Sequence, residues 1–273
     1  MQKERLDKLL SHEGFGSRKD IKKLLRTKTV ILNDKQIFDS SIQINPTKDK
    51  IFIDNKQIDF HKQIYIMMNK PKHTVSSSKD NEHQTVFDLL KKNLRTPYLA
   101  EKLHTVGRLD MDTEGMLLLT TDGNLTHRLI SPKSHIKKTY YCELEHSETK
   151  EHQIQIAELF KKGIKVAADD NDPGFICKSA EIQWQTEKTA LLTIYEGKYH
   201  QVKRMFIAVQ NKICYLKRIS IGNLMLDKTL SLGEYKFLTQ KDLELLNPDS
   251  ESTNLNASTS IGISAQKSIF KMH

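Results

Sequence analysis

The sequence predicts an α+β protein whose main sheet is largely antiparallel. Strand-like and helix-like segments are interspersed along the chain without a regular βαβ rhythm, which disfavours a parallel sheet. The chain of 273 residues is long enough for more than one domain, and its basic residues are concentrated near the start. We therefore expect a small helical domain with a short strand segment over residues 1–60, a sheet domain flanked by helices over 61–247, and a disordered tail over 248–273.

The N-terminal unit is expected to begin with two short helices. Leucines at helical spacing start at Leu6, and Gly14 and Gly16 are expected to end this first helix. Ser17 is then a suitable N-cap for a second helix, with Asp20 as its capping-box partner. The sequence next predicts a strand over 30–32, a turn at 33–34 and a polar linker over 54–63.

Residues 61–247 show the pattern of a larger domain. Its first strand, over 64–68, is expected to stop at the segment Asn69-Lys70-Pro71, because proline cannot continue a sheet ladder. Further strands are predicted at 116–121, 140–145, 180–184, 189–195 and 213–221. Helices are predicted at 86–93, 124–130, 151–162 with Gly163 as C-cap, 203–209 and 241–246.

Charge and composition narrow the class of partner. The net charge of +9 favours a polyanion, with nucleic acid ahead of an anionic membrane. No apolar run reaches the length of a membrane span and no signal-peptide pattern precedes the first helix, so we expect a cytoplasmic protein. The three cysteines, Cys142, Cys177 and Cys214, fit no zinc or redox spacing, and we interpret them as core thiols.

An acidic pair stands directly before an almost purely apolar run in the segment GRLDMDTEGMLLLTTDG, residues 107–123. Asp110 and Asp112 would most simply be turn residues that cap their own backbone. A second segment, EGKYHQVKRMF, places Lys203 and Arg204 where a loop enters a helix. A buried carboxylate needs a cationic partner to remain ionised, so the two segments together indicate a candidate active site.

The basic N-terminal unit resembles a known module. Through RLDKLL, SRKDIKKLL and the strand that follows, residues 5–50 resemble the αL RNA-binding motif of a small-subunit ribosomal protein and of several RNA-modifying enzymes. The resemblance implies binding to structured RNA, with phosphate contacts from the basic face of the two helices. The RNA-binding candidates are Arg5, Arg18, Lys19, Lys22, Lys23 and Arg26.

The larger domain resembles a family of enzymes. The segment GRLDMDTEGMLLLTTDG, then KKTYY at 137–141, then EGKYHQVKRMFIAVQNKICYLKRISIGNLML resemble the Rsu-type bacterial small-subunit (16S) rRNA pseudouridine synthases. The resemblance implies isomerisation of an rRNA uridine to pseudouridine, an rRNA or assembling small subunit as partner, and no cofactor or metal. We expect a monomer.

The resemblance also implies roles for individual residues. Asp110 is the expected catalytic group, because a carboxylate can attack or stabilise the sugar cation that forms when the base detaches. Tyr140 is expected to pack on the target base, and Leu216 to line the uracil pocket. Lys203 is the preferred ion-pair partner of Asp110, with Arg204 as the other candidate or as a phosphate contact.

One departure from the family pattern concerns the loop after the first strand of this domain. The family commonly has glycine two residues after the proline of the NKP segment, whereas this chain has His73. We therefore expect this loop to bend differently.

Three other functions are compatible with parts of this pattern. A large-subunit (23S) rRNA synthase would use the same chemistry. A non-catalytic RNA-binding assembly factor would keep the basic unit but would not need Asp110 in its flanking sequence. A glycosidase usually needs two carboxylates in one site, and an RNA-binding unit would be out of place in it.

Overall fold

The computed structural model describes residues 3–247, except 47, 59–62, 92–93, 96 and 169–171. The expected tail over 248–273 and the middle of the expected linker therefore lie outside the described residues. Within the described part, no helix is long and apolar enough to cross a membrane.

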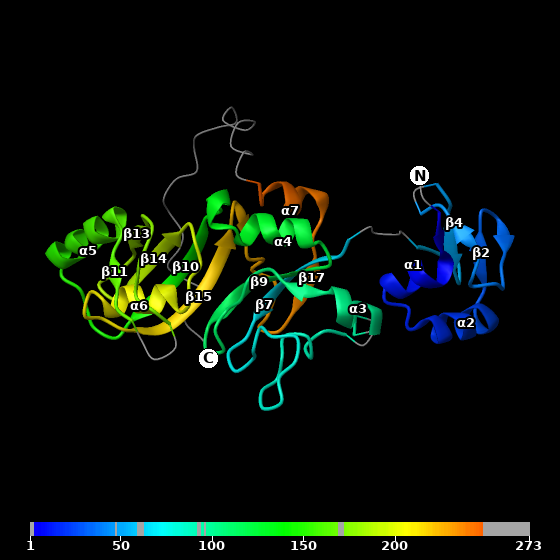
Figure 1. Cartoon of the computed structure of the whole chain (residues 1–273), viewed down its shortest axis with the longest axis horizontal. Coiled ribbons are helices and arrows are strands. Elements are labelled where there is room, and N and C mark those ends of the chain that lie inside the picture. The colour runs from blue at the N-terminus through cyan, green and yellow to red at the C-terminus, as the bar shows by residue number, and fades with distance from the viewer. Residues whose placement is uncertain are drawn as a thin grey trace.

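The N-terminal unit forms a lobe of its own, drawn in blue in Figure 1. All residues of its hydrophobic core lie between Leu6 and Ile58, and helices α1 and α2 pack against each other. Its small sheet has the order β3-β2-β5-β6. The elements of this unit are β1 (Glu4–Arg5), α1 (Leu6–His12), α2 (Arg18–Thr27), β2 (Val30–Leu32), β3 (Lys35–Gln36), β4 (Gln43–Ile44), β5 (Ile51–Ile53) and β6 (Lys56–Ile58).

The capping box predicted for the second helix is confirmed. Asp20 donates its backbone N–H to Ser17 Oγ at 3.3 Å, and Ser17 donates its own backbone N–H to Asp20 Oδ2 at 2.9 Å. The turn at 33–34 is also confirmed, with both residues at positive φ. The linker prediction is wrong in its first part, because Lys56–Ile58 is paired with β5 as strand β6.

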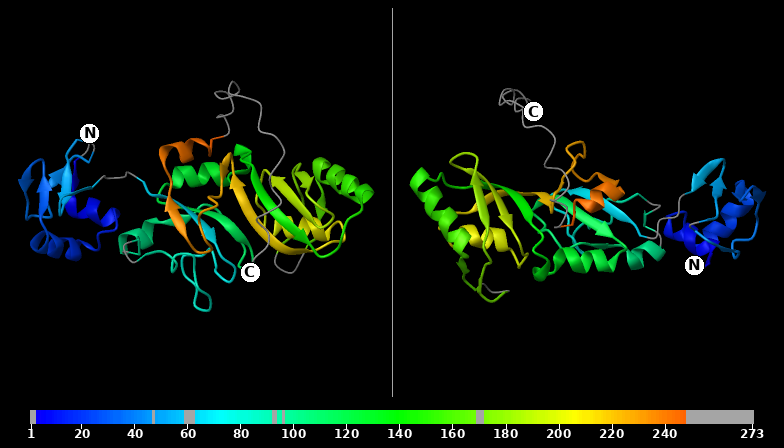
Figure 2. Two further views of the ribbon diagram at one scale, coloured as in Figure 1. Left: turned by 180° about the vertical axis from the view of Figure 1, so that it is seen from behind. Right: turned by 90° about the horizontal axis from the view of Figure 1, so that it is seen from above.

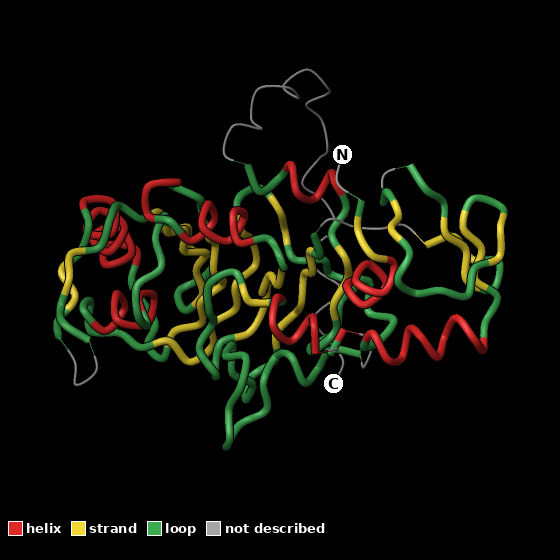
Figure 3. The backbone as a smooth tube through the Cα atoms, turned by 45° about the vertical axis from the view of Figure 1, so that its right-hand side comes forward, coloured by secondary structure: helices red, strands yellow, loops and turns green. Residues whose placement is uncertain are grey.

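The larger part of the chain is built on a mixed sheet. Its main order is β13-β14-β10-β15-β9-β7-β17, and all of its neighbours are antiparallel except β15 and β9. Figure 2 shows this sheet from behind and from above, and Figure 3 shows strands inside and helices outside. The strands are β7 (Tyr65–Lys70), β8 (His104–Thr105), β9 (Glu114–Thr120), β10 (Lys138–Leu144), β13 (Glu181–Trp184), β14 (Thr189–Ile194), β15 (Ile213–Ile221), β16 (Leu224–Met225) and β17 (Tyr235–Phe237). The prediction of an α+β fold with a largely antiparallel sheet is confirmed.

Helices cover both faces of this sheet. Strand β9 is buried along its whole length, with Leu117 and Leu119 on the face toward α5 and α6 and with Met116 and Leu118 on the face toward α4. Burial on both faces explains why this run is apolar without alternation. The remaining elements are α3 (Pro97–Lys102), α4 (Gly123–Ile130), η2 (Pro132–Ser134), α5 (Lys150–Lys162), β11 (Lys165–Val166), β12 (Phe175–Ile176), α6 (Gln201–Ile207) and α7 (Gln240–Glu244).

The predicted helix over 86–93 is wrong for its described residues, which form turns. The sequence begins as a helix would, with a hydrogen bond from Asp88 N–H to Thr85 Oγ1 and another from Thr85 N–H to Asp88 Oδ2. The bonds that follow link residues three apart, as from Leu90 N–H to Phe87 O. Val86 and Leu90 are almost fully buried, so packing into the core prevails over helix propagation.

The other predicted strands and helices are confirmed within two residues at their ends, and Gly163 caps α5 as expected. Cys142 and Cys177 are buried as predicted, whereas Cys214 is exposed and is not a core thiol.

The parallel pairing of β9 and β15 requires a glycine at Gly115. Its φ is +103°, and a Cβ atom there would lie 2.3 Å from the carbonyl oxygen of Arg218. The close approach of these two strands brings the loop before β9 next to the residues of β15.

Candidate active site

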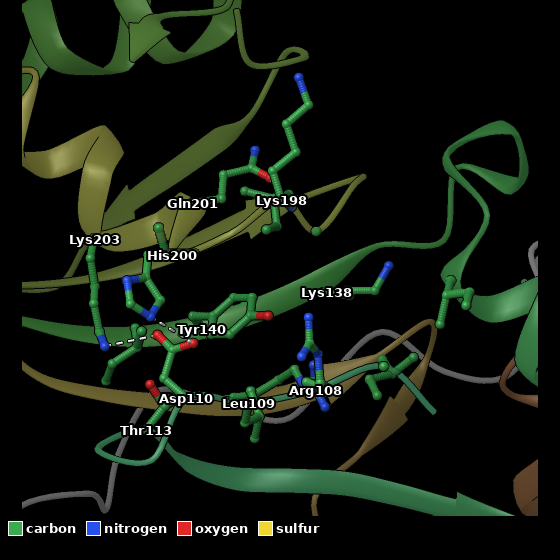
Figure 4. Close-up of a pocket in the computed structure, with 18 of the residues that line it drawn as sticks. Arg108, Leu109, Asp110, Thr113, Lys138, Tyr140, Lys198, His200, Gln201 and Lys203 are labelled. Carbon is green, nitrogen blue, oxygen red and sulfur yellow. Dashed lines mark hydrogen bonds and ion pairs between the residues drawn. The ribbon is translucent and has the colours of Figure 1, made fainter. Parts of the chain in front are cut away.

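The loop between β8 and β9 carries Asp110 into a pocket (Figure 4). Lys203 at the start of α6 places its Nζ 2.8 Å from Asp110 Oδ2, and His200 Nε2 lies 3.5 Å from Asp110 Oδ1. Lys203 also pairs with Asp112 Oδ1 at 2.6 Å. Burial alone would lower the pKa of Lys203, but the two carboxylates outweigh it and raise that pKa. Lys203 is therefore a permanently charged partner of Asp110 at neutral pH.

A buried lysine, Lys70, holds the backbone of the Asp110 loop, and the sequence did not identify it as a site residue. Lys70 is fully buried and donates from Nζ to the carbonyl oxygens of Asp110, Thr113 and Pro71, each at 3.0 Å. Burial lowers the pKa of Lys70 to about 8, although nearby carboxylates oppose the shift. The signal in the sequence was the NKP segment, which predicted only the end of a strand.

The loop that follows β7 braces the same backbone. Ser76 donates from Oγ to the carbonyl of Leu109 at 2.8 Å and accepts the N–H of Leu109 at 3.1 Å. His73 donates its backbone N–H to the carbonyl of Met111 at 2.8 Å. His73 has a φ of +61°, the left-handed conformation that favours glycine. His73 therefore adopts a backbone conformation that a glycine would also adopt, and the expected difference in bend from the family stays a prediction.

Strands β10 and β15 supply one wall of the pocket. Tyr140 is 7% exposed and Leu216 is 5% exposed, and both line the pocket with Asp110 and Lys203. Tyr140 faces Arg218 across the strand pair. Four of the five predicted site residues are thus brought together.

Arg204 is the exception, and the structure does not bring it into the pocket. Its Nη1 pairs with Asp172 Oδ1 at 2.9 Å, its Nη2 donates to the carbonyl of Ala167 at 2.6 Å, and its guanidinium lies over the ring of Phe175. The Arg204 side chain is 7% exposed. Helix α6 points Lys203 and Arg204 in different directions, so Arg204 is held by structural partners away from Asp110, and its phosphate contact stays a prediction.

The basic residues predicted for RNA binding are on the N-terminal unit. The five side chains predicted on α2, namely Arg18, Lys19, Lys22, Lys23 and Arg26, are all exposed. Arg5 instead pairs with the buried Asp7 at 2.6 Å, and this partner lowers the pKa of Asp7. Arg5 therefore has a structural partner in the absence of RNA.

Other pocket residues were not predicted. Figure 4 shows Asp110, His200 and Lys203 at one end of the pocket and Arg108 and Lys138 toward the other, with Tyr140 between them. Among the described residues, no group of His, Cys, Asp and Glu has the arrangement of a metal site.

Comparisons with known proteins identify the family. The pattern that defines the RNA pseudouridylate synthases matches residues 64–208. The chain is 41% identical to the uncharacterized RNA pseudouridine synthase YtzG of Bacillus subtilis (strain 168), over 89% of this chain and 98% of that protein. It is 36% identical to ribosomal small subunit pseudouridine synthase A of Escherichia coli (strain K12), over 88% of this chain and 98% of the relative.

A solved structure agrees with this assignment. The crystal structure of a pseudouridylate synthase superimposes with a TM-score of 0.59 at 34% identity, over 89% of this chain and 99% of that chain. The matched pattern, the near-complete alignment with the relatives and the shared fold lead to one conclusion: the chain belongs to the RNA pseudouridylate synthase family.

Proposed function

We propose that this enzyme converts a specific uridine of small-subunit (16S) ribosomal RNA to pseudouridine. The relatives named small-subunit synthases align over almost their whole length, including the N-terminal unit. We further propose that residues 1–60 act as an RNA-binding domain and 61–247 as the catalytic domain. We also propose that the enzyme acts as a monomer, because Asp110, Lys203, Tyr140 and Leu216 meet in one pocket of a single chain.

One observation carries the catalytic proposal: Asp110 lies in the pocket, ion-paired with Lys203 and beside the Tyr140 ring. The uridine must leave its base stack and enter this pocket, at a cost of a few kcal/mol. The Asp110 carboxylate then supports cleavage of the bond between N1 and C1′, as a nucleophile or as a counter-charge to the sugar cation. The detached uracil rotates, C5 bonds to C1′, and the C5 proton is lost while N1 gains one, so the product is an isomer of the substrate.

The remaining pocket residues have supporting roles in this proposal. Tyr140 packs against the uracil, and Leu216 provides the apolar wall that keeps the detached base in place. Lys203 is the counter-charge of Asp110, with its Nζ 2.8 Å from Asp110 Oδ2.

The basic face of α2 holds the RNA by its phosphates, which offsets the cost of base flipping. Arg18, Lys19, Lys22, Lys23 and Arg26 are exposed on that helix and are free to follow a phosphate backbone. This domain contributes binding and supplies no reacting group.

The test compares two aspartates of the same loop. Asp110→Asn removes the charge that faces the pocket, and we expect no detectable pseudouridine in 16S rRNA, with RNA affinity within about threefold of wild type. Asp112 is 64% exposed, and exposed ion pairs contribute less than about 1 kcal/mol, so Asp112→Asn should keep most of the rate. The measurement is pseudouridine mapping of 16S and 23S rRNA from cells that lack the gene and carry either variant.

Two results would contradict the proposal. Turnover by Asp110→Asn, with deamidation to Asp excluded by mass spectrometry, would remove Asp110 from the catalytic role. A pseudouridine missing from 23S rather than 16S rRNA in the deletion strain would show that the large subunit carries the substrate.

A further inference from the structure

The end of the pocket away from Asp110 carries positive charge that no carboxylate of the described pocket lining balances. Among the described residues that line the pocket, Asp110 is the only carboxylate, whereas the cations include Arg108, Lys138, Lys203 and Arg218. Lys203 is neutralised by Asp110 and by Asp112. The described structure gives no ion pair to Arg108, Lys138 or Arg218, so this end of the pocket has an excess of positive charge.

The sheet fixes two of these cations on the face that Tyr140 occupies. Lys138 and Tyr140 are two residues apart on β10, so their side chains leave the strand on the same side. Arg218 is the cross-strand partner of Tyr140 on β15, and it lies two residues after the pocket residue Leu216. Lys138 and Arg218 therefore form a cationic pair next to the aromatic ring.

The cationic pair is only partly satisfied. Arg218 is 3% exposed, and its Nε donates to the carbonyl of Met116 at 2.8 Å. Its Nη2 has no hydrogen-bond partner among the described residues. Lys138 donates from Nζ to the carbonyl of Ile136 at a long 3.3 Å. Burial, and then the charge of Arg218, lower the pKa of Lys138 to about 8, and no carboxylate opposes this shift.

Buried charges in proteins are normally paired, so the missing partner of this pair should come from the substrate. We propose that Lys138 and Arg218 form an anion subsite that binds a backbone phosphate of the target nucleotide. A uracil carbonyl would accept one hydrogen bond but would leave the positive charge unbalanced. A phosphodiester carries a full negative charge and accepts several bonds, and charge-assisted bonds of this kind are the strong ones.

This proposal rests on the proposed function of the same pocket and adds the group that orients the nucleotide. Lys138 on β10 and Arg218 on β15 would then make the phosphate contact that was expected of Arg204. Lys138 and Arg218 are positioning residues here, because they contact the phosphate and not the reacting atoms C1′, N1 and C5.

The experiment uses the full chain and small probes, so it does not depend on knowing the target uridine. The δ1 methyl groups of Ile194 and Ile221 are suitable NMR reporters, because both residues line the pocket and both are cross-strand partners of Lys138. The probes are uridine, uridine 5′-monophosphate, uridine 3′-monophosphate and inorganic phosphate. The variants are Lys138→Met, Lys138→Arg and, as matched control, Lys133→Met at an exposed lysine of η2.

In the wild type, one of the two monophosphates should bind at least about tenfold more tightly than uridine, a ratio typical of charge-assisted hydrogen bonds. The two monophosphates distinguish a 5′ from a 3′ phosphate. Lys138→Met should remove the difference while leaving uridine affinity unchanged, Lys138→Arg should restore most of it, and Lys133→Met should behave as wild type.

Two outcomes would overturn the anion subsite, and a third would overturn the proposed function while leaving the subsite in place. A preference for the monophosphate that persists in Lys138→Met overturns the subsite. An equal loss of uridine and monophosphate binding in that variant overturns it too, because Lys138 would then contact base or sugar. In the third outcome, uridine shifts the methyl signal of neither isoleucine, but inorganic phosphate shifts the Ile221 signal only when Lys138 is present. The anion subsite then stands and the proposed function fails.

Discussion

Replacing Lys70 with methionine tests how the catalytic loop is held in place. Methionine is also unbranched and lacks the ammonium that bonds the carbonyls of Pro71, Asp110 and Thr113. These bonds fix the backbone on either side of the Asp110 side chain. Since a displacement of about 1 Å at a reacting group can cost about 100-fold in rate, we expect Lys70→Met to lower the single-turnover rate by about that factor. RNA affinity should change by less than about threefold.

Stability should respond differently from the rate. The pKa of Lys70 falls from 10.5 to about 8 on folding, so the buried charge costs about 3 kcal/mol at pH 7. Lys70→Met relieves this cost but removes the Lys70 donor from the carbonyl of Thr113, at about 1–3 kcal/mol, whereas the carbonyls of Pro71 and Asp110 keep the Thr74 hydroxyl and the Thr113 N–H as donors. The two effects oppose each other, and the net change in the free energy of unfolding at pH 7 should be small compared with either.

The pH dependence isolates the buried charge. Between pH 8 and 10.5 the unfolded chain holds a proton on Lys70 that the folded chain has released, so Lys70 makes the wild type more stable as the pH rises. Relative to Lys70→Met, the wild type should gain about 2 kcal/mol between pH 7 and pH 9.5. Urea unfolding of both proteins at the two pH values measures this difference, because the other titrating groups are shared. A stability difference that does not change with pH, or a full rate in Lys70→Met, would refute the reasoning.

Three further predictions follow from packing and charge. Gly115→Ala should lower the free energy of unfolding by more than about 3 kcal/mol, because its Cβ would meet the carbonyl of Arg218 at 2.3 Å; an unchanged melting temperature would contradict the close approach of the two strands. Arg204→Met should destabilise the fold by about 1–3 kcal/mol because it removes the charge-assisted hydrogen bonds of a buried guanidinium to Asp172 and Ala167, with no change in the salt dependence of RNA binding; a shallower dependence would place Arg204 on the RNA. Lys22→Gln with Lys23→Gln should reduce the slope of log affinity against log salt by about 0.7–0.9 for each phosphate that is no longer neutralised; an unchanged slope would show that this helix face does not bind the substrate.

Local rules allowed much of the fold to be predicted from the sequence. The Ser17 and Asp20 capping box begins a helix because its two hydrogen bonds are made within four residues. The strand over 213–221 was predicted at its observed bounds. The helix predicted over 86–93 was wrong for its described residues, although Thr85 and Asp88 make the two hydrogen bonds of a capping box, because Leu90 is drawn into the core.

The site was less accessible to such reasoning because its parts are distant in sequence. Asp110 and Lys203 are joined only when β9 and β15 pair in parallel and α6 packs over them. Lys70 was overlooked because nothing in the sequence shows that a lysine at the end of a strand is fully buried. The Lys138 and Arg218 pair likewise depends on the register between β10 and β15.

Helical periodicity shows that Lys203 and Arg204 point in different directions, but it does not show which of them pairs with Asp110. Successive residues of a helix are rotated by about 100°, so two adjacent basic residues cannot both face one carboxylate. Val202 and Phe206 are buried in the core, which fixes the inward face of α6 and leaves Lys203 and Arg204 on different flanks. The hairpin of β11 and β12 decides which of the two residues meets Asp110. Residues in and next to this hairpin, namely Ala167, Asp172 and Phe175, contact the guanidinium of Arg204 and hold it away from the pocket. That hairpin shows no pattern that links it to Arg204, so only the folded chain assigns the arginine to structure and the lysine to the pocket.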